Sequence, residues 1–244
     1  MNIVIGVISC YAYRDTWKPF FSLFRKFWPF CPYPVYLLSD ILESFDYVRH
    51  LSHKSGPEEM FCWPNETWCG IAAKFAEQAI ERHELILLIQ DDFFLSAPPV
   101  PYLIERAAHR LIDRNAGCVR LYPCPGADAP DDPPDPHYGL VSPGAPYRIS
   151  CQVALWRPDY LLQIASHTRN TPADFEIKGS NFSNSLPDPI YAFNRDVQPW
   201  PIQYLCSAIS RGKWTKEARE FCRRHDVSRH LDWSMRPTEG EETT

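Results

Sequence analysis

The sequence predicts a single α/β domain in which helices cover both faces of a mostly parallel sheet. Short apolar runs alternate with amphipathic helical patterns through residues 1–120. One run, 85–89, consists of five consecutive aliphatic residues, which is typical of a strand buried on both faces. A length of 244 residues suits one such domain, and a hydrophobic content of 45% is sufficient for its core.

Each expected element follows from its own local pattern. Between Trp17 and Trp28, aromatic residues recur at spacings of three and four, which predicts an amphipathic helix that ends before Pro29. Strands are expected at 3–9, 35–38, 85–89, 117–122 and 150–156, with another leading through 208–214 into a basic loop. Helices are expected at 16–28, 67–83, 102–114, 158–165 and 215–225.

Three segments are expected to lack regular structure. Residues 46–63 have a mixed pattern. Residues 122–146 hold eight of the 24 prolines, which predicts a long loop with a lid or binding role. Residues 236–244 are expected to form a flexible tail. Within the single domain, residues 1–120 alternate strands and helices regularly, and residues 121–225 are less regular.

Charge and cysteine content exclude some classes of protein and favour others. The net charge of −5 gives no overall attraction to nucleic acid or anionic membrane. Nine cysteines without a CxxC pair favour a reducing compartment. No signal peptide is recognisable and no apolar run reaches the ~18 residues that span a bilayer. We therefore expect a cytoplasmic protein.

The strongest candidate site follows the 85–89 run directly. Asp91 and Asp92 would lie at the carboxyl end of a buried strand, where open α/β sheets bind ligands. Buried carboxylates need a cationic partner, so the pair indicates a divalent metal that carries a phosphorylated substrate. The alternative is that one carboxylate caps the next element and the other is solvated.

Four segments together resemble the GT-A class of nucleotide-sugar glycosyltransferases, and more narrowly a group of small bacterial and phage proteins. They are DDFFL at 91–95, QVALWRPDYL at 152–161, FEIKGS at 175–180 and RGKW at 211–214. Their order along residues 1–220 makes the resemblance more specific than any one segment. The resemblance implies a protein of a bacterial cell or a phage-infected host, with a nucleotide-binding half at 1–120 and an acceptor and catalytic half at 121–225. The class usually carries Asp-x-Asp, whereas this chain has Gln90-Asp91-Asp92.

The resemblance implies a nucleotide-diphosphate sugar, most simply a UDP-sugar, and Mn²⁺ or Mg²⁺ to neutralise the leaving diphosphate. Asp92 would be the direct metal ligand, and Asp91 would contact the ribose or the metal's water shell. At the end of the first strand, Ser9 and Tyr11 would hold the nucleotide, with Tyr11 stacked on the base.

For each of two further aspartates near the strand ends, the sequence leaves two possible roles open. Asp15 would accept a hydrogen bond from a base N–H, or would cap the helix that follows. Asp40, at the end of the second strand, has the same alternatives.

The later segments supply the other candidate groups. Glu176 is our candidate general base for an inverting transfer, with Asp174 in reserve; a surface ion pair with Lys178 is the alternative. Arg211 and Lys213 would clamp the diphosphate, or would form a solvated loop. Trp214 would pack under that loop or stack on a sugar.

Several functions remain open from the sequence. The acceptor is expected to be a surface glycan, with Trp156 or Trp214 stacking on it. The alternative is a hydroxymethylated pyrimidine in phage DNA, since residues 211–224 contain six basic residues. A sugar-nucleotide nucleotidyltransferase is a third possibility, although the 9–13 loop has no glycine. A non-catalytic binding domain is the fourth.

Overall fold

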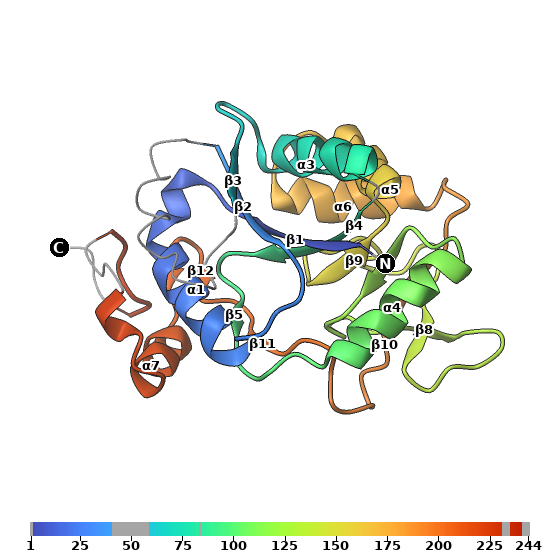
Figure 1. Cartoon of the computed structure of the whole chain (residues 1–244). Helices are drawn as coiled ribbons and strands as arrows, with labels where there is room; N and C mark the ends of the chain where they lie inside the picture. Colours follow the sequence, from blue (N-terminus) through green and yellow to red (C-terminus); the bar gives the residue numbers. More distant parts are fainter. Residues whose placement is uncertain (1, 41–58, 83, 231–234, 241–244) are drawn as a thin grey trace.

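A computed structural model describes residues 2–40, 59–82, 84–230 and 235–240. In this part of the chain, nine strands form one sheet in the order β3-β2-β1-β4-β9-β6-β10-β8-β7 (Figure 1). They are β1 (Ile3–Ile8), β2 (Val35–Ser39), β3 (Glu59–Cys62), β4 (Leu85–Gln90), β6 (Cys118–Arg120), β7 (Ala129–Pro130), β8 (Tyr138–Leu140), β9 (Ala154–Trp156) and β10 (Ile190–Phe193). Two smaller pairs join β5 (Phe94–Leu95) to β11 (Tyr204–Leu205) and β12 (Ile209–Ser210) to β13 (Lys213–Trp214).

The strand directions confirm the predicted mostly parallel sheet. The adjacent strands β3, β2, β1 and β4 are parallel to one another. β9 runs antiparallel between β4 and β6, and β10 is parallel to β6. Antiparallel β8 and β7 complete the far edge. The carboxyl ends of the four parallel strands therefore meet at one edge of the sheet.

Helices cover both faces of the sheet, as predicted (Figure 1). The helices α3, α5 and α6 lie on one face, and α1 and α4 lie on the other. Their bounds, with those of the last helix, are α1 (Arg14–Phe27), α3 (Trp68–Arg82), α4 (Pro101–Asp113), α5 (Pro158–Thr168), α6 (Pro172–Ser183) and α7 (Lys216–Arg224). A 3₁₀ turn, η1 (Tyr11–Tyr13), links β1 to α1, and η3 (Ser228–His230) follows α7.

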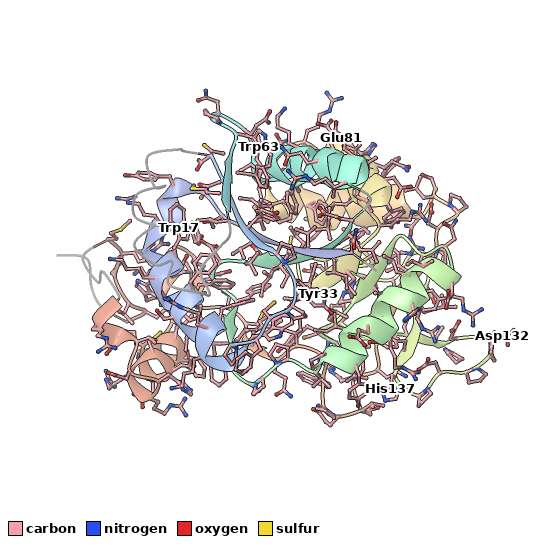
Figure 2. All side chains as sticks on the ribbon, viewed as in Figure 1. Trp17, Tyr33, Trp63, Glu81, Asp132 and His137 are labelled. Carbon is pink, nitrogen blue, oxygen red and sulfur yellow. The ribbon has the colours of Figure 1, made fainter. Side chains whose placement is uncertain are left out.

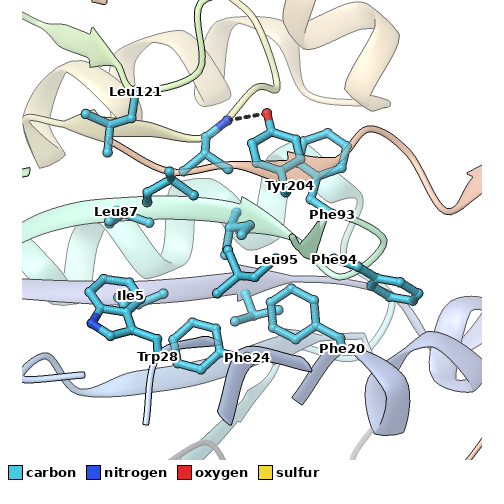
Figure 3. Close-up of a cluster of buried hydrophobic side chains, with 14 of the residues drawn as sticks. Ile5, Phe20, Phe24, Trp28, Leu87, Phe93, Phe94, Leu95, Leu121 and Tyr204 are labelled. Carbon is cyan, nitrogen blue, oxygen red and sulfur yellow. Dashed lines mark hydrogen bonds between the residues drawn. The ribbon is translucent and has the colours of Figure 1, made fainter. Parts of the chain in front are cut away.

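The pleat of each strand sends alternate side chains to opposite faces. Ile5 and Val7 of β1 belong to the apolar cluster under α1 and α4, whereas Val4 and Ile8 belong to the cluster under α3, α5 and α6. Figure 3 shows the first cluster, in which Tyr204 accepts a hydrogen bond from the backbone N of Val153. Both faces of β1 and β4 are filled, so their carboxyl ends are held rigidly.

Two segments expected to be irregular contain strands. Part of 46–63 forms β3, while residues 41–58 lie outside the described residues. Within 122–146, Tyr138–Leu140 pairs with β10 and with β7. Asp131 and Asp135 of this segment form ion pairs with Arg110 of α4, which fasten it to the domain despite its prolines. Figure 2 shows the region, with Asp132 and His137 labelled beside α4.

The expectation of a flexible tail is wrong for residues 236–240. We call residues 236–239 the C-terminal strap. Arg236 and Thr238 are buried, Trp214 donates from its backbone N to Pro237 O at 2.9 Å, and Glu239 N donates to Trp214 O at 2.9 Å. The strap binds through its backbone and through the polar side chains of Arg236 and Thr238, which is consistent with its polar sequence. No helix in the described residues is long and apolar enough to cross a membrane.

Candidate functional site

Asp91 and Asp92 lie where the sequence predicts, immediately after β4. They are 4% and 8% exposed and line a cavity of about 700 Å³. The cavity lies between the carboxyl ends of β1 and β4 and the first residues of α3 and α6. Two buried carboxylates therefore face a space large enough for a nucleotide-sized ligand.

The two carboxylates have raised pKa values because they are buried next to one another. Burial, reinforced by the charge of Asp92, raises the pKa of Asp91 to about 8. Burial raises the pKa of Asp92 to about 6, although Ser207 and Arg236 partly offset this. A bound cation would stabilise both charged forms, so the pair has the chemistry of a metal site.

The donor set fits Mg²⁺ or Mn²⁺ in one particular way. In the described residues, no cluster of three or more His, Cys, Asp or Glu side chains could hold a metal. Mg²⁺ is commonly bound by one or two carboxylates together with substrate phosphates and water. Asp91 and Asp92 could therefore hold a cation that also binds the diphosphate of a substrate. With the residues that the structure describes, they do not form a site in which the protein supplies every metal ligand.

Ser9 orients Asp91 from beneath. Oδ2 of Asp91 accepts from Ser9 Oγ at 2.5 Å and from Thr16 Oγ1 at 2.7 Å. Trp17, labelled on α1 in Figure 2, donates from Nε1 to Ser9 Oγ at 2.6 Å. Ser9 is thus occupied within this buried network, and the predicted contact of Ser9 with the nucleotide stays a prediction.

Tyr11 and Asp40 join the ends of the first two strands. Asp40 Oδ1 accepts from Tyr11 N at 2.7 Å and from Ser39 Oγ at 3.2 Å. The guanidinium carbon of Arg14 lies 4.0 Å from the centroid of the Tyr11 ring. Asp40 therefore fixes the backbone of the η1 turn, and the predicted stacking of Tyr11 on a base remains a prediction.

Asp15 does not cap α1, because the helix begins at Arg14 and its N-cap position is Tyr13. The carboxylate is buried and forms a forked ion pair with Arg236, with Nε to Oδ2 and Nη2 to Oδ1 both at 2.7 Å. Both oxygens are occupied, so the predicted contact with a base would require Arg236 to be displaced. Arg236 is a site residue that the sequence analysis assigned to a flexible tail.

Glu176 and Asp174 have different surroundings on α6. Glu176 Oε1 accepts from Cys151 N at 2.9 Å and from Ser150 Oγ at 3.3 Å. Asp174 lines the cavity, but it closes a capping box with Thr171 and pairs with Lys178 at 2.7 Å. The hydrogen bond from Lys178, with help from Thr171, lowers the pKa of Asp174 below that of a free aspartate.

The 211–214 segment forms a tight hairpin. Arg211 and Gly212 both have positive φ, and the turn projects Arg211 into solvent. Trp214 is fully buried against Phe94, with ring centroids 6.1 Å apart. The expectation that Trp214 stacks on a sugar is therefore wrong, and so is the same expectation for Trp156, which is 1% exposed.

The sequence analysis missed residues that complete the site from distant segments. Thr16 bonds to Asp91, Ser207 lowers the pKa of Asp92, and Arg236 pairs with Asp15. Neither Ser207 nor Arg236 belongs to a recognised motif. Each is far in sequence from Asp91 and Asp92 and comes near them only in the folded protein.

Comparisons with known proteins give similarity of fold only. No known family model and no curated protein matches the chain. Similar solved structures include Staphylococcus aureus TarS 1–349, with 12% identity over 79% of this chain and 60% of that chain and a TM-score of 0.48. The same TarS fragment in complex with UDP-GlcNAc is 12% identical over 93% of this chain and 66% of that chain, with a TM-score of 0.43. A cytidylyltransferase from Leptospira borgpetersenii is 10% identical over 75% of this chain and 71% of that chain, with a TM-score of 0.46. At this level of similarity, the function has to be inferred from the site itself.

Proposed function

We propose that the chain is a glycosyltransferase that moves a sugar from a nucleotide-diphosphate donor, most simply a UDP-sugar, to a hydroxyl acceptor. The observation that carries the proposal is the buried pair Asp91 and Asp92 at the open end of a parallel sheet, facing a cavity of about 700 Å³. The order of the DDFFL, QVALWRPDYL, FEIKGS and RGKW segments supports the same class.

In this proposal, Asp92 and Asp91 hold Mn²⁺ or Mg²⁺, which acts as a Lewis acid on the leaving diphosphate. Ser9 and Thr16 keep the Asp91 carboxylate in place through their hydroxyls. Tyr11, whose backbone is held by Asp40, provides a ring for the base.

Glu176 is the proposed base that takes the proton of the acceptor hydroxyl. Cys151 N and Ser150 Oγ hold its Oε1, which fixes the direction of the carboxylate. The neighbouring Cys151 thiol has its pKa raised by burial and by the charges of Glu176, Cys69 and Asp92. Glu176 is not among the residues that line the cavity, whereas Asp174 is, so Asp174 stays the reserve candidate for the base.

A nucleotide-sugar screen by thermal shift, with and without Mn²⁺, tests the proposal. The true donor at a hundredfold excess over its dissociation constant stabilises by ~2.7 kcal/mol. Asp92→Asn should fold and lose this gain, whereas Asp113→Asn, at an exposed carboxylate at the end of α4, should keep it. If no nucleotide sugar stabilises the protein with Mn²⁺, the proposal is wrong.

The proposed acceptor is a glycan, and modified phage DNA is a second candidate because α7 carries exposed cations. The side chains of Arg223 and Arg224 are 69% and 65% exposed, although both lie near Glu220. A gel-shift titration with hydroxymethylated duplex at two salt concentrations distinguishes the acceptors. Tight binding that weakens steeply with salt, and weakens further in Arg223→Ala/Arg224→Ala, would favour DNA.

A further inference from the structure

The C-terminal strap reaches the donor site through a single buried side chain. Arg236 is separated from Asp15 by 221 positions in sequence, yet the two form a forked ion pair. Nη2 of Arg236 also donates to Ala12 O at 2.6 Å. The Arg236 and Asp15 side chains are 8% and 0% exposed, so water hardly competes for these bonds.

Two groups that act at the site lie within the segment that Arg236 holds, Tyr13 in the η1 turn and Thr16 at the start of α1. Tyr13 lines the cavity, and its ring centroid lies 4.5 Å from the guanidinium carbon of Arg236. Thr16 Oγ1 lies 2.7 Å from both Asp91 Oδ2 and Tyr13 O, and its single hydroxyl hydrogen is shared between these two acceptors. A displacement of this turn would therefore move a cavity wall and a hydrogen bond to Asp91 together.

The strap has a second attachment that does not involve Asp15. Thr238 Oγ1 accepts from Arg219 Nη1 of α7 at 2.6 Å, and the strap backbone pairs with Trp214 of β13. Loss of the Arg236 fork would leave this second attachment intact. The effect of Arg236 on the site can thus be separated from its effect on docking of the strap.

We propose that Arg236 is a positioning residue of the donor site, which acts through Asp15, Ala12 O and the Tyr13 ring to hold the η1 turn against Asp91. The part that concerns the donor rests on the proposed function; the part that concerns the turn does not. A lysine has one ammonium group and cannot reproduce the planar fork on both Asp15 oxygens together with the bond to Ala12 O.

The test compares Arg236→Lys with Arg219→Lys, which alters the second attachment instead. Hydrogen exchange followed by mass spectrometry should show residues 10–16 exchanging at least fivefold faster in Arg236→Lys and unchanged in Arg219→Lys. Arg236→Lys is the primary variant because it keeps a cation beside the buried Asp15; Arg236→Gln would leave that carboxylate unpaired.

The ligand arm uses Mn²⁺ together with whichever of UDP, GDP, CDP, ADP and dTDP stabilises the wild-type protein most. Arg236→Lys should weaken binding of this pair at least tenfold, and Arg219→Lys should change it by less than twofold. A purely structural role predicts equal ligand losses for variants with equal shifts in melting temperature, and that result would overturn the proposal. Unchanged exchange at 10–16 would overturn it as well. Faster exchange in a protein that binds no nucleotide would leave the turn assignment standing and reject the proposed function instead.

Discussion

In β1 and β4, aliphatic side chains fill both faces of the sheet, whereas in the second half of the chain two buried arginines bind loop backbone. Arg120 donates to Pro125 O at 2.6 Å and Tyr147 O at 2.7 Å, and Arg148 donates to Ser183 O at 2.8 Å. Arg120 and Arg148 are 2% and 4% exposed. Burial lowers the pKa of Arg120.

The comparison shows how a region with few long strands can still satisfy its buried backbone groups. Long strands satisfy their own backbone groups, whereas buried loops leave carbonyl oxygens that need donors. A guanidinium carries five donors and can satisfy several carbonyls at once. The first half thus places Asp91 and Asp92 at the end of packed strands, with hydroxyl groups that bond to Asp91. In the second half, polar contacts hold Glu176.

The largest effect is expected for Glu176→Gln, which tests whether the polar half carries the chemistry. Turnover should fall ~10²- to 10⁴-fold, the usual contribution of a positioned base, while donor affinity stays nearly unchanged. Steady-state kinetics with donor titrations check this, with Glu81→Gln on α3 as an exposed control. A collapse of donor affinity would instead make Glu176 a donor ligand.

Leu87→Ala should damage the packed half most. Leu87 is 1% exposed in β4, so the truncation leaves a cavity between strand and helix and costs ~2–5 kcal/mol in the free energy of unfolding. Urea denaturation measures the loss, and Ile177→Ala, at a side chain that is 63% exposed, should change stability by no more than ~0.5 kcal/mol. Equal losses for the two variants would show that β4 is not a rigid support.

Arg120→Met should destabilise the loops of the second half of the chain, because their backbone carbonyls lose hydrogen-bond donors. Methionine fills similar space without donors, so the carbonyls of Pro125 and Tyr147 lose partners, at about 1–3 kcal/mol for each that stays buried. Hydrogen exchange should rise in the loops 123–126 and 147–150 and stay unchanged in β1. If β1 and these loops respond alike, the two halves are not stabilised separately.

The smallest effect is expected for the pH dependence of the gain in melting temperature that Mg²⁺ produces at Asp91 and Asp92. With pKa values raised to about 8 and about 6, Asp91 and Asp92 keep protons in the folded state that the unfolded chain releases near pH 4. Stability contributed by the pair therefore falls as pH rises toward 8, and cation binding must displace these protons. Melting scans should show a larger gain from Mg²⁺ at pH 8 than at pH 6, and Asp92→Asn should remove the difference.

The sequence was sufficient for elements whose signal is local. Five consecutive aliphatic residues before Asp91 located β4 and the carboxylate pair, and the aromatic spacing located α1. α6 was not predicted, because its apolar side chains are few and its start depends on Thr171 and Pro172. β8 was not predicted, because the prolines around it are typical of a loop.

The positions of candidate residues were predictable at strand ends and unpredictable where distant segments return, and their roles stay predictions. Asp91, Asp92, Tyr11 and Asp40 follow strands, so topology alone gathers them. Arg236 and Ser207 come from short or irregular segments, and no local pattern marks the tertiary contact that each makes. Trp214 was ambiguous for a related reason, since a tryptophan in a loop motif can face either the core or the solvent.

The C-terminal strap has a consequence for biosynthesis. A ribosome releases the sheet and both carboxylates long before Arg236, so a nascent chain can fold its core while the turn at 11–13 still lacks its clamp. The proposed donor site would then be completed only when the strap docks. If the proposed function holds, a chain stalled or cleaved shortly before Arg236 would bind the donor more weakly than the full chain.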